Sequence, residues 1–165
     1  MFRKAETKDI DQIVELLKSA KRRMAEDNLE QWANGEEGYP NREIVVSDIE
    51  KQEMYVIDLD GDIAAVCAIN DDFYESYPVK IEKQDARTIH RVAVNQNYLG
   101  QGIGKQIYAN AEQTIKQMGY NTAVVDTYTM NIKMCNLIKV CNYTELGEFQ
   151  LFDDLPNWVM FKKEL

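Results

Sequence analysis

Hydrophobic and polar residues follow two different periods along this chain of 165 residues, and the two periods predict strands and helices. Apolar runs of strand length, bounded by turn residues, predict strands at residues 2–6, 54–58, 63–69, 87–94, 122–128, 143–152 and 157–163. Apolar positions three and four residues apart predict helices at about 8–24, 47–51, 103–118 and 131–141. The order β-α-α-β-β-β-α-β-α-β-β predicts an α/β (α+β) fold with a mixed, mostly antiparallel sheet.

Turn residues mark the boundaries between several of these elements. Asp60-Gly61 joins two predicted strands and is a strong hairpin signal. Thr7 is expected to cap the first helix. The segment 34–41 is rich in glycine, proline and asparagine and therefore predicts a loop, whereas residues 70–85 fit either a loop or a short helical insertion.

Composition limits the classes of protein to which the chain can belong. A hydrophobic content of 45% and a charged content of 28% are typical of a globular protein, and residues 1–165 are expected to form a single domain. No apolar run approaches about 18 residues and the start, Met1-Phe2-Arg3-Lys4, has no apolar signal segment, so we expect a cytoplasmic protein without membrane contact. The three cysteines lack Cys-x-x-Cys spacing, which favours small buried residues in a reducing compartment.

The charge balance bears on the partners of the protein. Its formal net charge is −9, which argues against nucleic acid as a partner, because a phosphate backbone needs a basic face. An acidic surface fits a cationic amine as substrate, and it equally fits a protein whose charge serves only solubility. A homodimer is compatible with the sequence, which gives no further indication of assembly.

A glycine-rich segment lies between a predicted strand and a predicted helix, and it reads Leu99-Gly100-Gln101-Gly102-Ile103-Gly104-Lys105. Three alternate glycines at a helix start leave backbone N–H groups bare, and the positive end of the helix dipole lies beside them. Such an arrangement is typical of a site for a phosphate or pyrophosphate group. The segment therefore predicts a ligand that carries phosphate.

Two nucleotide-binding loops can be compared with this spacing. A P-loop, Gly-x-x-x-x-Gly-Lys-Ser/Thr, would place its first glycine at Leu99 and its hydroxyl at Gln106, so it is excluded. A dinucleotide fingerprint, Gly-x-Gly-x-x-Gly, lacks its third glycine at Lys105 or Ile107, although Asp126 follows where a ribose-binding acid belongs. A helix cap without a ligand is the remaining alternative, which the helix-destabilising effect of the glycines disfavours.

Several segments resemble the GNAT superfamily of acetyl-CoA-dependent N-acyltransferases. Leu99–Gly104 is similar to the family motif Gln/Arg-x-x-Gly-x-Gly/Ala and follows the strand Val92-Ala93-Val94, as in that family. The start, Phe2–Ile10, resembles the family's first strand and helix, and Asn131–Leu137 with Asn142-Tyr143 resembles its Asn-x-x-Ala/Met-x-x-Leu…Gly-Phe segment. The resemblance spans nearly the whole chain and implies a central sheet of about seven strands flanked by about four helices.

The resemblance also implies that acetyl-CoA is the co-substrate and that no metal is needed. The glycine loop would hold the pyrophosphate, the preceding strand would pair with the pantetheine arm, and a helix-start asparagine would contact that arm. These residues are Val92, Ala93, Val94, Leu99, Gly100, Gln101, Gly102, Ile103, Gly104, Lys105 and Asn131. The backbone N–H of Val92 would face the thioester oxygen as an oxyanion donor. Leu99 stands where the family has Gln or Arg, which removes a polar contact but no backbone donor.

One histidine is available for proton removal. His90 is the only histidine of the chain, and imidazole ordinarily titrates close to neutral pH, which suits the deprotonation of an ammonium group. Alternation along the strand would place Thr88, His90, Val92 and Val94 on one face, with Thr88 near the position of the family's usual base. His90 is therefore a candidate general base, with a purely structural histidine as the alternative.

The resemblance does not identify the acid that protonates the leaving thiolate. Many relatives have a tyrosine for this step directly after the leucine of the asparagine-containing segment, and the matching residue here is Ile138. Another hydroxyl, from Tyr108, Tyr128 or Tyr143, or water would then serve. Asn142 replaces the family's glycine before the aromatic residue, and asparagine is the next best residue for a left-handed helix end.

Aromatic residues in predicted loops are candidates for the acceptor site. Trp32, Tyr39, Tyr74 and Tyr77 lie in such loops beside several glutamates, and aromatic rings with carboxylates suit an ammonium group. Packing of these rings onto the sheet is an equally good explanation. Either way, the sequence does not identify the amine.

Three functions remain to be compared. The resemblance favours an N-acetyltransferase that acts on a primary amine of a small molecule or a protein by direct attack in a ternary complex. A non-catalytic acyl-CoA-binding or sensor protein of the same fold is the alternative, because the usual acid is missing and the histidine has a structural explanation. A dinucleotide-dependent oxidoreductase is the third, and it predicts stabilisation by NAD rather than by CoA.

Overall fold

The structure is a computed structural model that describes residues 1–29, 31–32, 35, 37–151 and 157–165. The chain forms two compact units. The first unit comprises Met1–Ala68 and Arg91–Ile107, and the second comprises Ile69–His90 and Tyr108–Leu165. The single domain expected from the sequence stays a prediction.

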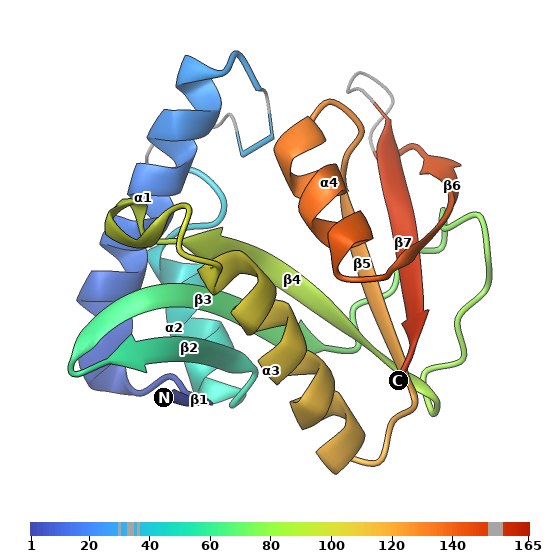
Figure 1. Cartoon of the computed structure of the whole chain (residues 1–165), viewed down its shortest axis with the longest axis horizontal. Helices are drawn as coiled ribbons and strands as arrows, with labels where there is room; N and C mark the ends of the chain where they lie inside the picture. The colour runs from blue at the N-terminus through green and yellow to red at the C-terminus, as the bar shows by residue number, and fades with distance from the viewer. Residues whose placement is uncertain (30, 33–34, 36, 152–156) are drawn as a thin grey trace. The chain divides into compact units, whose positions relative to one another are not determined.

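The predicted order of strands and helices is confirmed (Figure 1). Seven strands form one mixed sheet in the order β1-β2-β3-β4-β5-β7-β6. The pair β4 and β5 is parallel, whereas β1–β2, β2–β3, β5–β7 and β6–β7 are antiparallel. The strands are β1 (Phe2–Lys4), β2 (Met54–Leu59), β3 (Asp62–Asn70), β4 (Ala86–Val94), β5 (Thr122–Tyr128), β6 (Thr144–Phe149) and β7 (Trp158–Glu164).

The first unit packs two helices, α1 (Ile10–Glu26) and α2 (Arg42–Glu50), against β2 and β3. Apolar residues at helical spacing on α1, including Ile13 and Leu17, are fully buried with strand residues such as Val66. The hairpin between β2 and β3 turns at the predicted pair, where Asp60 and Gly61 both have positive φ (55° and 95°).

The second unit is built on the antiparallel strands β5, β7 and β6. Helix α4 (Ile132–Val140) packs beside β5, and Asn142 beyond it has the left-handed conformation expected for this helix end (φ 66°). Most of α3 (Ile103–Gln117) belongs to this unit and ends before Gly119. A small core of residues from β4, β5, β6, β7 and the preceding loop fills the unit: Tyr77, Ala86, Val124, Phe149 and Met160.

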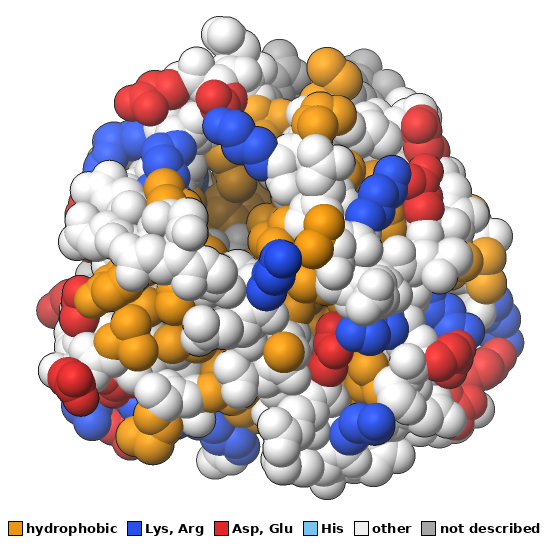
Figure 2. Space-filling view, viewed as in Figure 1, with side chains coloured by type: hydrophobic (Ala, Val, Ile, Leu, Met, Phe, Trp, Pro, Cys, Tyr) orange, Lys and Arg blue, Asp and Glu red, His pale blue; other side chains and the backbone are white. Residues whose placement is uncertain are grey.

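The surface carries charges of both signs. Acidic and basic side chains lie side by side on the face that Figure 2 shows. Within the described ranges, none of the helices combines the length and apolar character of a membrane span. The same ranges contain no group of three His, Cys, Asp or Glu residues that could hold a metal ion. The three cysteines are free and buried, as expected for small core residues.

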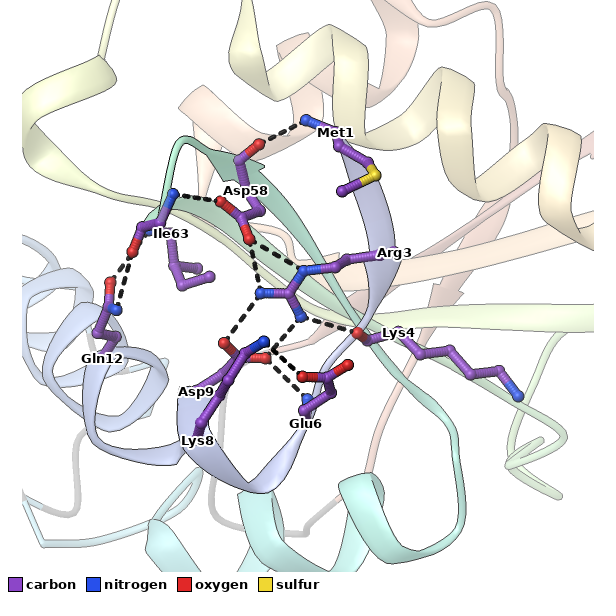
Figure 3. Close-up of polar contacts among 10 residues, drawn as sticks. Met1, Arg3, Lys4, Glu6, Lys8, Asp9, Gln12, Asp58 and Ile63 are labelled. Carbon is purple, nitrogen blue, oxygen red and sulfur yellow. Dashed lines mark hydrogen bonds and ion pairs between the residues drawn. The ribbon is translucent and has the colours of Figure 1, made fainter.

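A buried ion-pair cluster joins β1 to the start of α1 and to β2 (Figure 3). The Arg3 guanidinium donates to Asp9 (Nη1–Oδ2 2.7 Å) and to Asp58 (Nη2–Oδ2 2.7 Å). The Asp9 carboxylate also accepts from the backbone N–H of Glu6 at 2.7 Å, so Glu6 and not Thr7 is the capping residue, with Asp9 as its capping-box partner. Thr7 instead lies in a 3-10 turn, Thr7–Asp9, that leads into α1.

The second helix begins earlier than its hydrophobic pattern predicts. It starts at Arg42, because the Asn41 side chain caps it by accepting from the Ile44 N–H at 3.1 Å. The β-branched run Ile44-Val45-Val46 weakens the helical signal at this point, which explains the difference from the predicted 47–51. Residues 71–85 form turns and irregular backbone without a helix, which decides between the two alternatives for that segment.

Candidate active site

The glycine loop connects β4 to α3 through a short 3-10 turn, Gln96–Tyr98. Gly100 and Gly102 have φ values of 75° and 80°, a region that L side chains rarely adopt. A Cβ added at either position would meet nothing within 4 Å, so the backbone conformation, and not crowding, requires glycine in the protein alone. The open space above both residues remains available to a ligand.

Four backbone N–H groups of this loop are free donors. The N–H groups of Gly100, Gly102, Ile103 and Gly104 donate to no acceptor among the residues that the structure describes. The N–H of Gln101 donates to the Tyr98 carbonyl (3.4 Å). The Lys105 N–H donates to the Gly102 carbonyl (3.0 Å) and so closes the first turn of α3. Free donors at the N-terminus of a fifteen-residue helix make an anion site.

Hydrogen bonds within the first unit fix the segment that precedes this loop. Asn95 donates from its backbone to the Ala64 carbonyl (2.9 Å) and from its side chain to the Ile63 carbonyl (3.1 Å). The Tyr98 hydroxyl donates to Asp62 (2.7 Å). Because these contacts lie directly before the glycines, the free N–H groups are held in place before any ligand arrives.

The regular course of β4 is interrupted in its middle. Arg91 has a φ of 53°, which is unusual for a residue with a side chain and breaks the extended backbone of the strand; we call this interruption the bulge of β4. The expected alternation of Thr88, His90, Val92 and Val94 on one face therefore does not run unbroken through the strand, because alternation requires extended backbone at every residue. Parallel pairing of β4 with β5 is confined to Ala86–Thr88 and Thr122–Val124.

His90 lies in a cluster within the second unit, which we call the histidine cluster: His90, Asp126, Asp72, Tyr77 and Tyr74. His90 Nε2 lies 3.2 Å from the Asp72 carbonyl oxygen, and Nδ1 lies 4.0 Å from Oδ2 of Asp126. The side chains of His90 and Asp126 are 10% and 3% exposed. The Tyr77 hydroxyl donates to the same Asp126 oxygen at 2.5 Å.

This geometry assigns different roles to the two ring nitrogens. A carbonyl oxygen only accepts, so Nε2 carries a proton and Nδ1 is left as the lone-pair nitrogen of the neutral ring. Nδ1 faces Oδ2 of the Asp126 carboxylate. Burial raises the pKa of the Asp126 carboxyl, while the charge of His90 and the hydrogen bond from Tyr77 act in the opposite direction. Nδ1 therefore has the geometry of a proton acceptor beside a carboxylate.

Aromatic rings cover the histidine cluster. Tyr74 is 37% exposed and lies against Tyr77, His90 and Phe149, with ring centroids 5.5, 6.3 and 6.2 Å away. Tyr77 is buried, and burial together with Asp126 raises the pKa of its hydroxyl, which makes it a structural donor and not an acid. Of the two predicted acceptor residues in this unit, Tyr74 offers the accessible ring.

The other two predicted acceptor residues belong to the first unit. Trp32 is partly buried and packs against the core that α1 and β2 share, as the packing explanation predicts. Tyr39 is 41% exposed, and its hydroxyl accepts from Nη1 of Arg91 at 2.9 Å. Both rings thus have a structural partner within their own unit.

The candidates for the acid are all buried. Ile138 is fully buried in place of the family's tyrosine. Tyr108, Tyr128 and Tyr143 are 1%, 2% and 5% exposed, and burial raises the pKa of Tyr143 above that of an ordinary tyrosine. A raised pKa makes the Tyr143 hydroxyl a poor proton donor near neutral pH.

For three residues of the site, the sequence indicates a different role from the one that the structure shows, or no role at all. Asn131 caps α4 by accepting from the Met134 N–H (3.1 Å), a role that its position at the helix start could have predicted. The sequence indicates Asp126 only as a possible ribose-binding acid. It does not indicate that the Asp72 carbonyl contacts His90. Asp126 is the one carboxylate in the otherwise largely apolar strand β5. Because a buried carboxylate is rare without a partner, this position could have predicted a nearby polar group.

Comparisons with known proteins bear on the family and the fold of the chain. The model of the acetyltransferase (GNAT) family matches residues 13–143. A GNAT acetyltransferase structure from Streptococcus agalactiae is 25% identical, with a TM-score of 0.84, and the match covers 100% of this chain and 95% of that one. A GNAT acetyltransferase structure from Listeria monocytogenes is 19% identical (TM-score 0.77; 100% and 94% covered). The yncA structure from Salmonella typhimurium, solved with its cofactor acetyl-CoA, is 14% identical (TM-score 0.73; 100% and 93% covered). A search among curated proteins found no match.

Proposed function

The chain belongs to the acetyltransferase (GNAT) family, and from this premise we propose that it transfers the acetyl group of acetyl-CoA to a primary amine of a small molecule or a protein. The family match and the related structures make it an acyltransferase enzyme. The observation that carries the proposal is the set of free N–H donors at the start of α3, which follows β4 along the chain.

The glycine loop fits the pyrophosphate of acetyl-CoA. The N–H groups of Gly100, Gly102, Ile103 and Gly104 supply the donors, and the helix dipole of α3 favours the negative charge. The exposed side chain of Lys105 adds a positive charge at the same helix start. Because pairing with β5 is confined to the first three residues of β4, we assign pairing with the extended pantetheine arm to Val92–Val94.

His90 acts as the general base in this proposal. Acetyl-CoA supplies the acetyl thioester, and the amine nitrogen forms the new C–N bond as the C–S bond breaks. Nδ1 of His90 takes the proton that the amine loses, directly or through a water molecule, and Asp126 balances the resulting charge. The N–H of Val92 stabilises the oxygen on which negative charge develops. Water returns a proton to the thiolate, because Tyr108, Tyr128 and Tyr143 are buried.

Thiol release over a panel of amines tests this proposal. The panel contains polyamines, amino acids, aminoglycosides and peptides with free N-termini, and mass spectrometry identifies any product that is heavier by one acetyl group. We expect amine-dependent release of CoA with at least one class. Thermal-shift measurements with acetyl-CoA, CoA, NAD and ATP form the control, and acetyl-CoA and CoA should stabilise the protein most. Stabilisation by NAD alone, or release that no amine accelerates, would contradict the proposal.

A further inference from the structure

Arg91 holds a backbone conformation that its side chain disfavours. Its φ of 53° lies in the left-handed region, where a Cβ crowds the following carbonyl group. Such a residue persists in a strand only where the surroundings enforce it, and residues of this kind concentrate at functional sites. The next residue along the chain is Val92, whose N–H we assign to the oxyanion.

A buried ion pair fixes the Arg91 side chain. Its Nε lies 2.7 Å from Oδ2 of Asp48 on α2, and its Nη1 donates to the Tyr39 hydroxyl at 2.9 Å. The side chains of Arg91 and Asp48 are only 8% and 6% exposed. The guanidinium is thus bonded at two nitrogens to two different segments of the first unit, which restricts both its position and its orientation.

We propose that Arg91, Asp48 and Tyr39 form a positioning group that fixes the bulge of β4 and thereby the direction of the Val92 N–H. The inference rests on the proposed function, because it concerns the oxyanion donor of that reaction. A peptide N–H turns with the backbone angles on either side of it, so release of the Arg91 side chain would let the bulge relax toward an ordinary strand. The Val92 N–H would then no longer point toward the oxyanion, while the protein keeps its fold.

A second ion pair in the same unit provides a matched comparison. Arg3 and Asp9 are 2.7 Å apart and largely shielded from solvent, with side chains 16% and 4% exposed. That pair joins the short strand β1 to the start of α1, and Arg3 is not among the residues with positive φ. Loss of charge at Asp9 should therefore lower stability without any effect on the bulge.

The experiment compares Asp48→Asn with Asp9→Asn in thiol-release kinetics over a range of acetyl-CoA concentrations at saturating amine. For Asp48→Asn we expect kcat to fall about tenfold while KM for acetyl-CoA changes less than about twofold, because a misdirected donor affects the transition state more than binding. For Asp9→Asn we expect kcat within about twofold of the unmodified protein together with a lowered unfolding temperature. An unchanged kcat in folded Asp48→Asn, with only the unfolding temperature lowered, overturns the proposal.

Tyr39→Phe provides a milder variant in case Asp48→Asn does not fold. It removes one hydroxyl and leaves the ion pair, so kcat should fall about threefold. An unchanged kcat in Tyr39→Phe would then count against the positioning role.

The amide resonance of Val92 gives a readout that does not need activity. In ¹⁵N-labelled protein, Asp48→Asn should shift this resonance and lower its protection from hydrogen exchange, whereas Asp9→Asn should change neither. If no amine is acetylated by the unmodified protein, the proposed function fails, and this measurement still decides whether the ion pair holds the bulge. A Val92 resonance that is the same in all variants overturns the inference.

Discussion

The glycine loop presents backbone groups, whereas the histidine cluster consists mainly of side chains. The loop uses the backbone N–H groups of four residues within one short segment, Gly100, Gly102, Ile103 and Gly104, and its side chains contribute little to the donor set. The cluster uses side chains and one carbonyl from three separate segments, at residues 72–77, 90 and 126. A site of the first kind depends on local backbone angles, whereas one of the second kind depends on the register of distant strands. We therefore expect mutations in the loop to change cofactor affinity and mutations in the cluster to change turnover.

The largest effect is expected from His90→Gln. Glutamine retains polar character but does not accept a proton, so kcat should fall about 100-fold, a typical loss for a general base. The dissociation constant of acetyl-CoA, measured by calorimetry, should stay within about twofold because the loop is untouched. A variant with unchanged kcat would return His90 to the structural explanation.

A smaller effect, on acetyl-CoA affinity and not on kcat, is expected from Gly102→Ala. An L side chain at a φ of 80° costs about 1–2 kcal/mol, and relaxation of the loop would turn its N–H groups away from the ligand. Acetyl-CoA should bind about tenfold more weakly, while kcat at saturation changes little. Gly119→Ala is the matched control, because Gly119 also has positive φ (92°) and open space but lies at the other end of α3. Equal losses of affinity in the two variants would show that backbone strain alone is responsible.

Asp126→Asn should separate activity from stability. Burial raises the pKa of Asp126 above 3.8, so its ionised form opposes folding as the pH rises past that value. Asparagine removes this cost and still accepts from the Tyr77 hydroxyl, so the unfolding temperature at pH 7 should equal or exceed that of the unmodified protein. The difference should vanish as the pH falls below about 4, where Asp126 is protonated in both states.

The same variant should lose activity despite its stability. Without a carboxylate opposite Nδ1, the protonated imidazole is less stabilised, and kcat should fall about tenfold. Thermal unfolding between pH 4 and 8, together with thiol-release kinetics, measures both effects. Lower stability at pH 7 with full activity would make Asp126 a structural residue.

The smallest effect is expected from Leu99→Gln. Leu99 is 50% exposed and occupies the position where the family has Gln or Arg. A polar side chain there should add one hydrogen bond to the ligand and improve acetyl-CoA binding about threefold, with kcat unchanged. Calorimetry measures this gain. Weaker binding would show that the exposed leucine itself contributes to the site.

The difference between features set by local sequence and features set by distant contacts also explains what the sequence could predict. Strand β5 was predicted with its observed bounds, Thr122–Tyr128, because its apolar run is continuous and clearly bounded. The glycine loop was equally predictable, because its donors depend on consecutive residues. The sequence pattern misses the capping box of Glu6 and Asp9 and the early start of α2, because side-chain hydrogen bonds decide both and leave the hydrophobic pattern unchanged.

The histidine cluster shows where prediction from the sequence ends. His90 was identified because it is the only histidine. Its partner Asp126 lies 36 residues further along the chain, and only the pairing of β4 with β5 brings the two strands together. The bulge at Arg91 was also missed, because a left-handed arginine has no signal in composition or period. It depends on tertiary contacts with Asp48 and Tyr39.

The central claim is that the loop governs cofactor affinity and the cluster governs turnover. The most direct test determines both the acetyl-CoA dissociation constant and kcat for Gly102→Ala and His90→Gln in one series with the best amine of the panel. We predict a crossed result, with affinity lost about tenfold only in Gly102→Ala and kcat lost about 100-fold only in His90→Gln. Parallel losses of both quantities in both variants would contradict the account.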